Sequence, residues 1–304
     1  MGVVYVGNVL AERSAHVSTG TLILDKHAPR HKFEELVTRI KTKGSLAGIQ
    51  ISCVTPELEP SRKWRPVSVP DEVQRLRQLV LRLSDGKLSA LLDGMIAAVE
   101  RARECGFDIL QIHAAHGYLL SLLISGRING RKGKFAHDSP WLENFLVSCS
   151  QGAGTSTLAL RLNALSGLES PATEAQLARM TACRATESGV QALDYSAGLY
   201  TLTRRLIYPG AELNGPAYEP YLGELLDSTV LTTICGRLGD LSSLTRFSGR
   251  LVYAVGRSLI ADPDCILNWQ RGHASRTTRC CSKNRCHYFS RGANELECGV
   301  NPEL

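Results

Sequence analysis

The chain has 304 residues, of which 43% are apolar and 21% charged, a composition typical of folded globular proteins rather than disordered or fibrous ones. Its formal net charge is +6, but the basic residues form small, scattered groups without interleaved aromatics, which argues against a nucleic-acid-binding surface. An anionic ligand held by one or two arginines fits this charge as well, and no apolar run is long enough to cross a bilayer.

The first third of the chain alternates between strand-like and helix-like segments. A β-branched strand is expected from Val3 to Gly7 and another from Ala47 to Ser52. Apolar residues recur at helical spacing over Lys32–Lys43 and again over Ser89–Cys105. Between them, Cys53–Asp71 carries four prolines and reads as a long loop.

The alternation continues from the strand Ile109–His113 to the C-terminal part. The expected segments are Trp141–Ser148, Ser156–Asn163, Glu174–Glu187, Ala192–Ser196, Tyr218–Asp227, Val230–Cys235, Leu241–Phe247 and Leu251–Val255. Apolar strands separated by helices are typical of parallel βαβ units. We therefore predict one α/β domain over residues 1–304, a (β/α)8 TIM-barrel-like fold. Its strands start near residues 3, 47, 109, 157, 192, 230 and 251, one fewer than a complete barrel has.

Polar side chains gather where these strands end. In a parallel barrel the C-terminal ends of all strands face one mouth. The polar positions expected there are Asn8, Gln50, His113, His116, Tyr118, Arg161, Asn163, Ser196, Tyr200, Gly236 and Arg257. No pair of carboxylates and no G-x-S-x-G elbow is among them, which argues against glycosidase and serine-hydrolase chemistry.

Two imidazoles and a phenol, His113, His116 and Tyr118, lie within six positions at the exit of one strand. A single histidine there is more often a hydrogen-bonded structural residue, but the three groups together favour an active site. Arg161 alternates with apolar neighbours and so faces inward, either toward an anionic ligand or toward a structural ion-pair partner. Arg257 follows Gly256 after the last strand, where a phosphate site is expected.

The tail, residues 272–304, contains Cys280, Cys281, Cys286 and Cys298 with His287. We expect it to pack on the barrel. The cysteine spacing is poor for a metal site because no C-x-x-C is present, so no metal is predicted. The chain has ten cysteines but lacks a secretory leader, from which we expect a cytoplasmic protein with reduced thiols.

Several motifs resemble the old yellow enzyme family of NADH:flavin oxidoreductases. They occur in family order over nearly the whole chain, and together they are highly specific: Gly48-Ile49-Gln50, Gly106-Phe107-Asp108, His113-Ala114-Ala115-His116-Gly117-Tyr118-Leu119-Leu120, Leu160-Arg161-Leu162-Asn163, Val255-Gly256-Arg257 and Cys298-Gly299-Val300-Asn301-Pro302. The resemblance implies a TIM barrel that holds FMN and reduces activated alkenes with NAD(P)H.

The resemblance also implies roles for individual residues. His113 and His116 match the pair that hydrogen-bonds a substrate carbonyl, and Tyr118 lies near the usual proton donor. The other implied roles are flavin-ring contacts (Gln50 and Arg161) and flavin-phosphate contacts (Gly236 and Arg257). For the substrate itself we expect further contacts from Gln50, Tyr200 and Asn163.

The chain departs from the family pattern at several points. It begins at what resembles the second strand of the family barrel, in agreement with the count of seven strands. Cys235 stands where the family has the first glycine of a phosphate-binding pair, and Ala197 replaces another glycine. Each lost glycine adds a side chain where backbone should approach phosphate. Lys283 stands where cluster-bearing relatives have a cysteine, which argues against an iron–sulfur cluster.

Three hypotheses for the function follow. The first is a flavin-independent isomerase without cofactor, in which His113 and His116 stabilise an enolate and Tyr118 or Tyr200 moves a proton. The second is an FMN-dependent NAD(P)H ene reductase, and the third is a catalytically degenerate binding or scaffold protein. We favour the first narrowly, because a missing strand removes one wall of the flavin site. The expected substrate is a hydrophobic carbonyl compound, such as a secondary metabolite, with neither nucleic acid nor membrane as partner. Because an open strand edge can pair with another chain, a homo-oligomer is one alternative.

Overall fold

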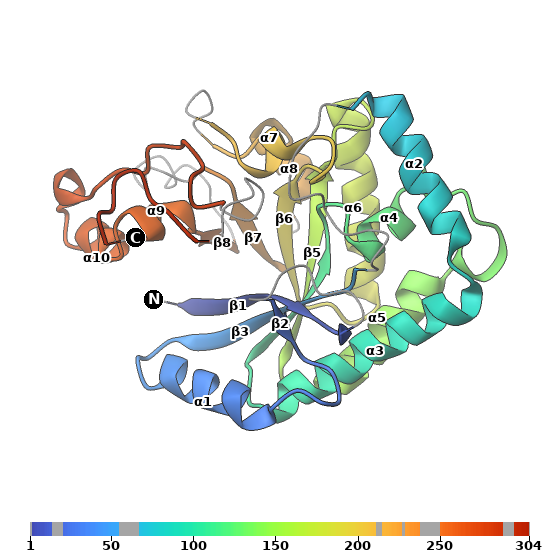
Figure 1. Ribbon diagram of the computed structural model, residues 1–304, viewed down its shortest axis with the longest axis horizontal. Coiled ribbons are helices and arrows are strands. Elements are labelled where there is room, and N and C mark those ends of the chain that lie inside the picture. Colours follow the sequence, from blue (N-terminus) through green and yellow to red (C-terminus); the bar gives the residue numbers. More distant parts are fainter. Residues whose placement is uncertain are drawn as a thin grey trace.

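The computed structural model describes residues 2–13, 21–54, 67–210, 215–226, 229–237, 250–287 and 295–303. Its centre is one parallel sheet of eight strands in the order β2-β1-β3-β4-β5-β6-β7-β8 (Figure 1). The strands are β1 (Val3–Leu10), β2 (Leu22–Ile23), β3 (Leu46–Ser52), β4 (Ile109–Ala114), β5 (Thr157–Leu165), β6 (Ala192–Ala197), β7 (Leu231–Cys235) and β8 (Leu251–Ala254).

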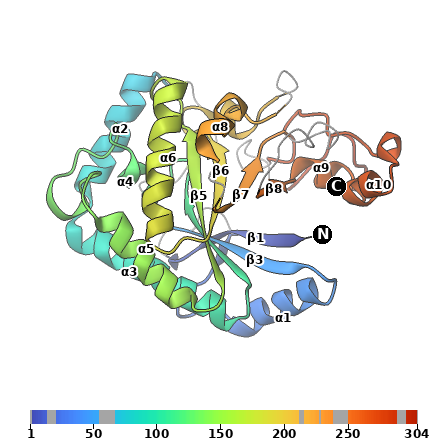
Figure 2. The same cartoon turned by 180° about the vertical axis from the view of Figure 1, so that it is seen from behind.

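Helices cover the outer face of the sheet, which curls into a half-barrel (Figure 2). They are α1 (Arg30–Lys41), α2 (Val69–Arg82), α3 (Asp85–Glu104), α4 (Leu119–Ile124), α5 (Trp141–Ala153), α6 (Pro171–Glu187), α7 (Arg204–Ile207), α8 (Leu222–Leu225), α9 (Arg257–Ala261) and α10 (Cys265–Gln270), with short 3-10 turns η3 (Gly133–Phe135), η4 (Glu219–Tyr221) and η6 (Ala274–Arg276). Helices α1 and α3 pack on β3, and α5 and α6 on β5. In the described ranges, none of the helices is both long and apolar enough to span a membrane.

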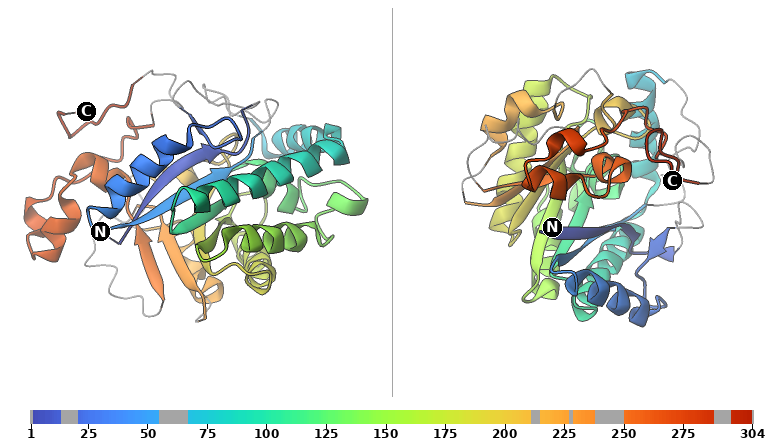
Figure 3. Two further views of the ribbon diagram at one scale, coloured as in Figure 1. Left: turned by 90° about the horizontal axis from the view of Figure 1, so that it is seen from below. Right: turned by 90° about the vertical axis from the view of Figure 1, so that its left-hand side faces the viewer.

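The predicted incomplete barrel is confirmed. All seven predicted strands are present. One further strand, β2, was not predicted; it has two residues, which pair with Val9 and Leu10 at the end of β1. Two residues are too few to show a period-two pattern. Among the described residues, β2 and β8 each have one neighbour in the sheet, so the barrel does not close. The C-terminal segment lies beside β8, on the side where the first residues of β1 also lie (Figure 3).

The longer helices agree with the sequence analysis, with one exception. Helix α2 begins at Val69, inside the predicted loop Cys53–Asp71, and was missed. Its signals were local: Ser68 caps it by accepting a hydrogen bond from the Asp71 backbone N–H at 3.3 Å, and a proline lies in its first turn. Residues 55–66 of that loop lie outside the described residues, as does the whole of the predicted segment Leu241–Phe247.

The segment Tyr218–Asp227 forms only the short turns η4 and α8, rather than a full helix. Tyr218 itself is buried, and its hydroxyl donates to the backbone carbonyl oxygens of Tyr195 at 2.6 Å and Cys235 at 2.8 Å. These bonds tie the segment to the ends of β6 and β7. Tertiary hydrogen bonds therefore take precedence over helix propensity here.

Side chains that alternate along the strands fill the interior of the half-barrel. Ile109, Ala159 and Ala192 form its lowest layer, against which Val3 packs. Parallel pairing then sets the polar side chains above this layer: Gln50 is the register partner of Gln111. The same rule makes His113 the partner of Arg161, and Arg161 the partner of Asp194 (β4, β5 and β6). The register thus brings polar groups from four strands to two successive levels of the barrel, Gln50 and Gln111 at one and His113, Arg161 and Asp194 at the next.

One buried carboxylate orders the loop that follows β5. Glu174 is 7% exposed and accepts hydrogen bonds from four consecutive backbone N–H groups, of residues 166–169, at 2.9 to 3.2 Å. The Ser166 carbonyl oxygen in turn accepts a bond from Thr203 Oγ1 at 2.6 Å, which connects this loop to the segment after β6. Glu174 therefore holds two of the loops at the barrel mouth.

Replacing Glu174 should destabilise the fold strongly. We expect Glu174→Ala to lower the free energy of unfolding by about 3 kcal/mol, because several buried N–H groups would lose their acceptor. Urea unfolding followed by circular dichroism measures this. The matched control is Glu187→Ala at the exposed end of the same helix, expected within about 0.5 kcal/mol of wild type. Equal values for the two variants would contradict the role given to Glu174.

Candidate active site

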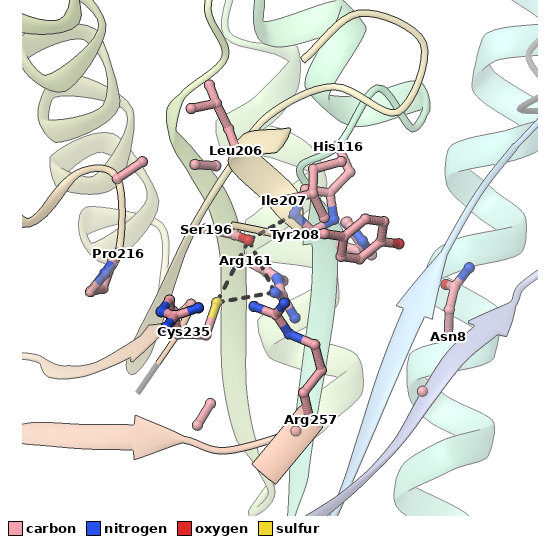
Figure 4. Close-up of a pocket in the computed structure, with 18 of the residues that line it drawn as sticks. Asn8, His116, Arg161, Ser196, Leu206, Ile207, Tyr208, Pro216, Cys235 and Arg257 are labelled. Atoms are coloured by element: carbon pink, nitrogen blue, oxygen red, sulfur yellow. Dashed lines mark hydrogen bonds between the residues drawn. The ribbon is translucent and has the colours of Figure 1, made fainter. Parts of the chain in front are cut away.

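A cavity of about 560 Å³ opens at the C-terminal ends of the strands, within the size range of small-molecule and cofactor sites (Figure 4). The residues predicted from the strand ends line it together, with Asn163 as the exception: Asn8, Gln50, His113, His116, Tyr118, Arg161, Ser196, Tyr200, Gly236 and Arg257. The sequence-based expectation of one convergent mouth therefore agrees with the cavity.

The end of β4 aims two imidazoles into the cavity. His113 Nδ1 accepts a hydrogen bond from the Ala115 backbone N–H at 3.1 Å, which leaves Nε2 to carry the proton of the neutral ring. His116 has a left-handed backbone, with φ of 62°, and its Nε2 lies 2.7 Å from Ser196 Oγ. The two ring centroids are 5.1 Å apart. A strained backbone of this kind is common at functional sites.

Burial lowers the pKa of both His113 and His116 well below its ordinary value, and the neighbouring Arg161 guanidinium lowers the pKa further. Both rings are therefore neutral near pH 7. A neutral imidazole donates one hydrogen bond and accepts another, so the pair is suited to polarising an uncharged carbonyl.

Three phenols line the same part of the cavity. Tyr118 OH accepts a hydrogen bond from Asn8 Nδ2 at 3.1 Å, and Tyr208 OH donates to Tyr200 OH at 3.0 Å. Their rings contact the imidazoles, with centroids 4.5 Å apart for His113 and Tyr118. Burial raises the pKa of Tyr118 and of Tyr208, so both phenols stay protonated. Tyr208 was not predicted, because it follows the short helix α7 rather than a strand.

Arg161 links both sides of the site. Its Nη2 donates to Ser196 Oγ at 3.1 Å and to Cys235 Sγ at 3.2 Å, and its Nη1 lies 3.9 Å from Asp194 Oδ2. Burial by itself lowers the pKa of Arg161, but the Asp194 carboxylate, acting together with Cys235, Tyr218 and Tyr200, raises it on balance, so the guanidinium stays charged. Within the described chain, Nε has no hydrogen-bond partner. The ion pair foreseen as one alternative exists, and one donor remains for a ligand.

Two further guanidiniums lie at the other end of the cavity. Arg257 Nη1 donates to the Pro209 carbonyl at 2.9 Å and to Asn284 Oδ1 at 2.7 Å. Arg237 Nη1 donates to the carbonyl of Gly210 and to the hydroxyl of Ser282, both at 2.6 Å. In the part of the chain that the structure describes, no carboxylate forms an ion pair with either guanidinium. Both are therefore available to an anion.

The loop after β7 has a backbone that few residues adopt. Gly236 has φ of 112°, a backbone conformation that residues with a side chain rarely adopt, so this position favours glycine. Arg237 follows with φ of 43°. Arg237 was not predicted as a site residue, although it adjoins the glycine that was.

The tail forms part of the cavity wall through His287. Its ring stacks on Tyr208 with centroids 3.5 Å apart, and burial lowers the pKa of His287 to about 4. All ten cysteines are free thiols. Among the described residues, no group of three or more His, Cys, Asp or Glu side chains is arranged to hold a metal ion.

Asn163 is the predicted residue that the structure does not bring to this cavity. Its side-chain oxygen accepts a hydrogen bond from the His116 backbone N–H, and its amide nitrogen donates to the Gly198 carbonyl, both at 3.3 Å. It lines a neighbouring cavity of about 410 Å³ instead. Asn163 thus holds the loop that carries His116.

Two buried polar residues below the cavity were also missed, Gln111 and Asp194. Gln111 Nε2 donates to Asp194 Oδ2 at 2.9 Å. Their signal was present, because Gln111 lies two positions before His113 and Asp194 two before Ser196, and strand residues two apart share a face.

A parallel half-barrel with imidazoles, phenols and guanidiniums converging at its strand ends is the architecture of a small-molecule α/β-barrel enzyme. The model of the NADH:flavin oxidoreductase / NADH oxidase family matches residues 7–204, and the chain belongs to this family.

Individual proteins agree with this assignment. The chain is 27% identical over 238 residues to an NADH oxidase of Thermoanaerobacter brockii, covering 72% of this chain and 35% of that protein. It is 26% identical over 193 residues to an NADPH dehydrogenase of Geobacillus thermodenitrificans, covering 60% and 54%. The chain thus spans about half or less of the relatives it matches. The old yellow enzyme structure from Trypanosoma cruzi superimposes with a TM-score of 0.67 over 97% of this chain and 85% of its own, at 13% identity, which shows the fold.

Family membership corrects the favoured sequence-based hypothesis. It supports an enzyme of the oxidoreductase class, and FMN with NAD(P)H, rather than an isomerase without cofactor. The isomerase hypothesis gave more weight to the missing strand than to the arginines that the chain retains. The residues present fit FMN: Arg237 and Arg257 suit its phosphate, Gln50 and Arg161 suit the polar edge of its ring, and Arg161 Nε is a buried donor in need of a partner.

The neutral histidines have a consequence for stability. Each has a pKa near 6.5 when unfolded and a lower one when folded, so below pH 6.5 the unfolded chain binds more protons and stability falls as the pH falls. We expect the loss of unfolding free energy between pH 7 and pH 5 to be smaller in a His113→Asn/His116→Asn variant, which lacks both titrating groups.

Denaturant unfolding across this pH range measures the effect. His31→Asn, on the exposed surface of α1, serves as the control and should keep the wild-type dependence. A double variant with the same pH dependence as wild type would mean that the two rings do titrate in the folded protein.

Proposed function

We propose that this chain binds FMN in the cavity and reduces a carbonyl-conjugated alkene with electrons from NAD(P)H. The observation that carries the proposal is the composition of one cavity, in which a neutral imidazole pair and phenols lie at one end and two guanidiniums without ion-pair partners among the described residues lie at the other. The family to which the chain belongs supports the same chemistry. The expected substrate is a hydrophobic small molecule with a carbonyl.

His113 and His116 hold the substrate in this proposal. Their neutral rings donate hydrogen bonds to the carbonyl oxygen, and these bonds strengthen as negative charge develops on that oxygen. FMN, when bound, supplies hydride transfer. Tyr118 supplies the proton: its pKa is raised, so the phenol is protonated at neutral pH, and Asn8 holds its oxygen in place.

Arg237 and Arg257 bind the FMN phosphate. Both reach the same end of the cavity from loops after neighbouring strands, and the rigid backbone at Gly236 fixes one of these loops. Hydrogen bonds from these guanidiniums to a phosphate, in which both partners are charged, are stronger than the bonds to uncharged carbonyl, amide and hydroxyl oxygens that they make now. Both arginines line the cavity although the barrel is half open.

The imidazole pair should be required for turnover but not for cofactor binding. We expect His113→Ala and His116→Ala each to lower kcat by about a hundredfold or more, because each removes a donor to the developing oxyanion. Anaerobic NADPH consumption with 2-cyclohexenone, and chromatography of the saturated product, measure this. His137→Ala, at an exposed position, is the control.

Wild-type protein that stays colourless after incubation with FMN would overturn the proposed function. So would double-bond migration in the product without NADPH, which the isomerase hypothesis requires.

The phosphate contact is tested by comparing two flavins. We expect Arg257→Leu to weaken FMN binding by about thirtyfold, equivalent to about 2 kcal/mol, and to leave riboflavin binding unchanged, because riboflavin lacks the phosphate. Fluorescence titration gives both affinities. The exposed Arg271→Leu is the control. An equal loss for both flavins would mean that Arg257 acts on the fold of the cavity instead.

A further inference from the structure

We propose that Asp194, which does not line the cavity, sets the direction of the hydrogen bonds that Gln50 offers to the flavin ring. This inference rests on the proposed function. Asp194 would be a positioning residue, acting on the cofactor through Gln111 and Gln50 rather than by contact.

A chain of two hydrogen bonds, one buried and one partly buried, connects Asp194 to the cavity. Asp194 is 4% exposed, and its Oδ2 accepts a bond from Gln111 Nε2 at 2.9 Å. Gln111 is 2% exposed, and its Oε1 accepts a bond from Gln50 Nε2 at 2.5 Å. Of the three residues, only Gln50 reaches the cavity.

The direction of this chain follows from the carboxylate. An ionised carboxylate only accepts hydrogen bonds, so Gln111 must turn its amide nitrogen toward Asp194 and its oxygen toward Gln50. Gln50 must then use its amide nitrogen on Gln111. Its oxygen is left for the cavity, where a Cβ on Gly7 would lie 3.7 Å from Gln50 Oε1. Gln50 therefore presents an acceptor to a ligand.

The strand register makes this long connection feasible. Gln111 on β4 is the register partner of Gln50 on one side and of Ala159 on the other. Ala159 is in turn the partner of Ala192 on β6. Because both neighbours at this level carry only a methyl group, the Gln111 side chain can reach across β5 to Asp194.

Arg161 favours the ionised form of the Asp194 carboxylate. Burial raises the pKa of Asp194 above its ordinary value, and the Arg161 guanidinium and the Gln111 hydrogen bond limit that rise. Arg161 also presents donors to the cavity. The cavity lining thus includes an acceptor from Gln50 and donors from Arg161, the two kinds of group that suit an imide, in which an N–H lies next to a carbonyl. The flavin ring carries such an imide edge.

The experiment compares two flavins in binding, with no turnover required. FMN carries the imide N–H, and N3-methyl-FMN lacks it. We expect wild-type protein to bind FMN at least tenfold more tightly, which is about the contribution of one hydrogen bond. In Asp194→Asn the amide can donate to Gln111, so Gln50 is free to turn its nitrogen to the cavity. The preference for FMN should then fall by about fivefold or more.

Three further variants sharpen the test. Asp194→Glu retains an acceptor and should keep most of the preference. Asp108→Asn alters a carboxylate before the start of β4, bonded to Lys41, and should keep all of it. Gln111→Leu cuts the chain while leaving the Asp194 charge in place. It should lose the preference like Asp194→Asn, and it carries the test if Asp194→Asn does not fold.

The outcomes separate the two proposals. A wild-type protein that binds neither flavin overturns the proposed function and this inference with it. A wild-type protein that prefers FMN, with Asp194→Asn and Gln111→Leu retaining the same preference, overturns the role of Asp194 alone and leaves flavin binding intact.

Discussion

The site depends on one half-buried cation, the Arg161 guanidinium. Arg161 lies on β5 between His113 on β4 and Asp194 on β6, and the parallel register places all three at one level. Its charge lowers the pKa of both His113 and His116 and opposes the effect of burial on Asp194. Arg161 also donates a hydrogen bond to Ser196 Oγ, and the same oxygen lies 2.7 Å from His116 Nε2. A neutral residue here would leave a buried carboxylate without a counter-ion.

The barrel can stay half open without disrupting the imidazole end of the site, because the residues there come from strands in the middle of the sheet rather than from its open edges. The imidazoles, Arg161 and Ser196 lie on or after β4, β5 and β6, in the middle of the sheet. The cavity end that carries Arg237 and Arg257 is supported by the tail, where Ser282 and Asn284 accept hydrogen bonds from the two guanidiniums. The tail thus has a structural role close to the proposed phosphate site.

Much of the fold and part of the site could be predicted from the sequence. Strands of four or more residues show an apolar pattern, and the histidines and Tyr118 lie close together along the chain, so local signals are sufficient. The two-residue strand β2 has no such pattern. The narrow preference for an isomerase came from weighing one missing strand against residues whose arrangement was unknown.

The sequence by itself determined the seven longer strands and the strand-end location of His113, His116 and Arg161. Only the tertiary structure decided which groups meet. Tyr208, Arg237 and His287 come from loops and the tail, and no pattern in the chain predicts where these fold back. Asp194 and Gln111 are more than eighty positions apart, joined by a hydrogen bond across an intervening strand. Such contacts depend on register and on the volume of intervening side chains, which exist only once the sheet has formed.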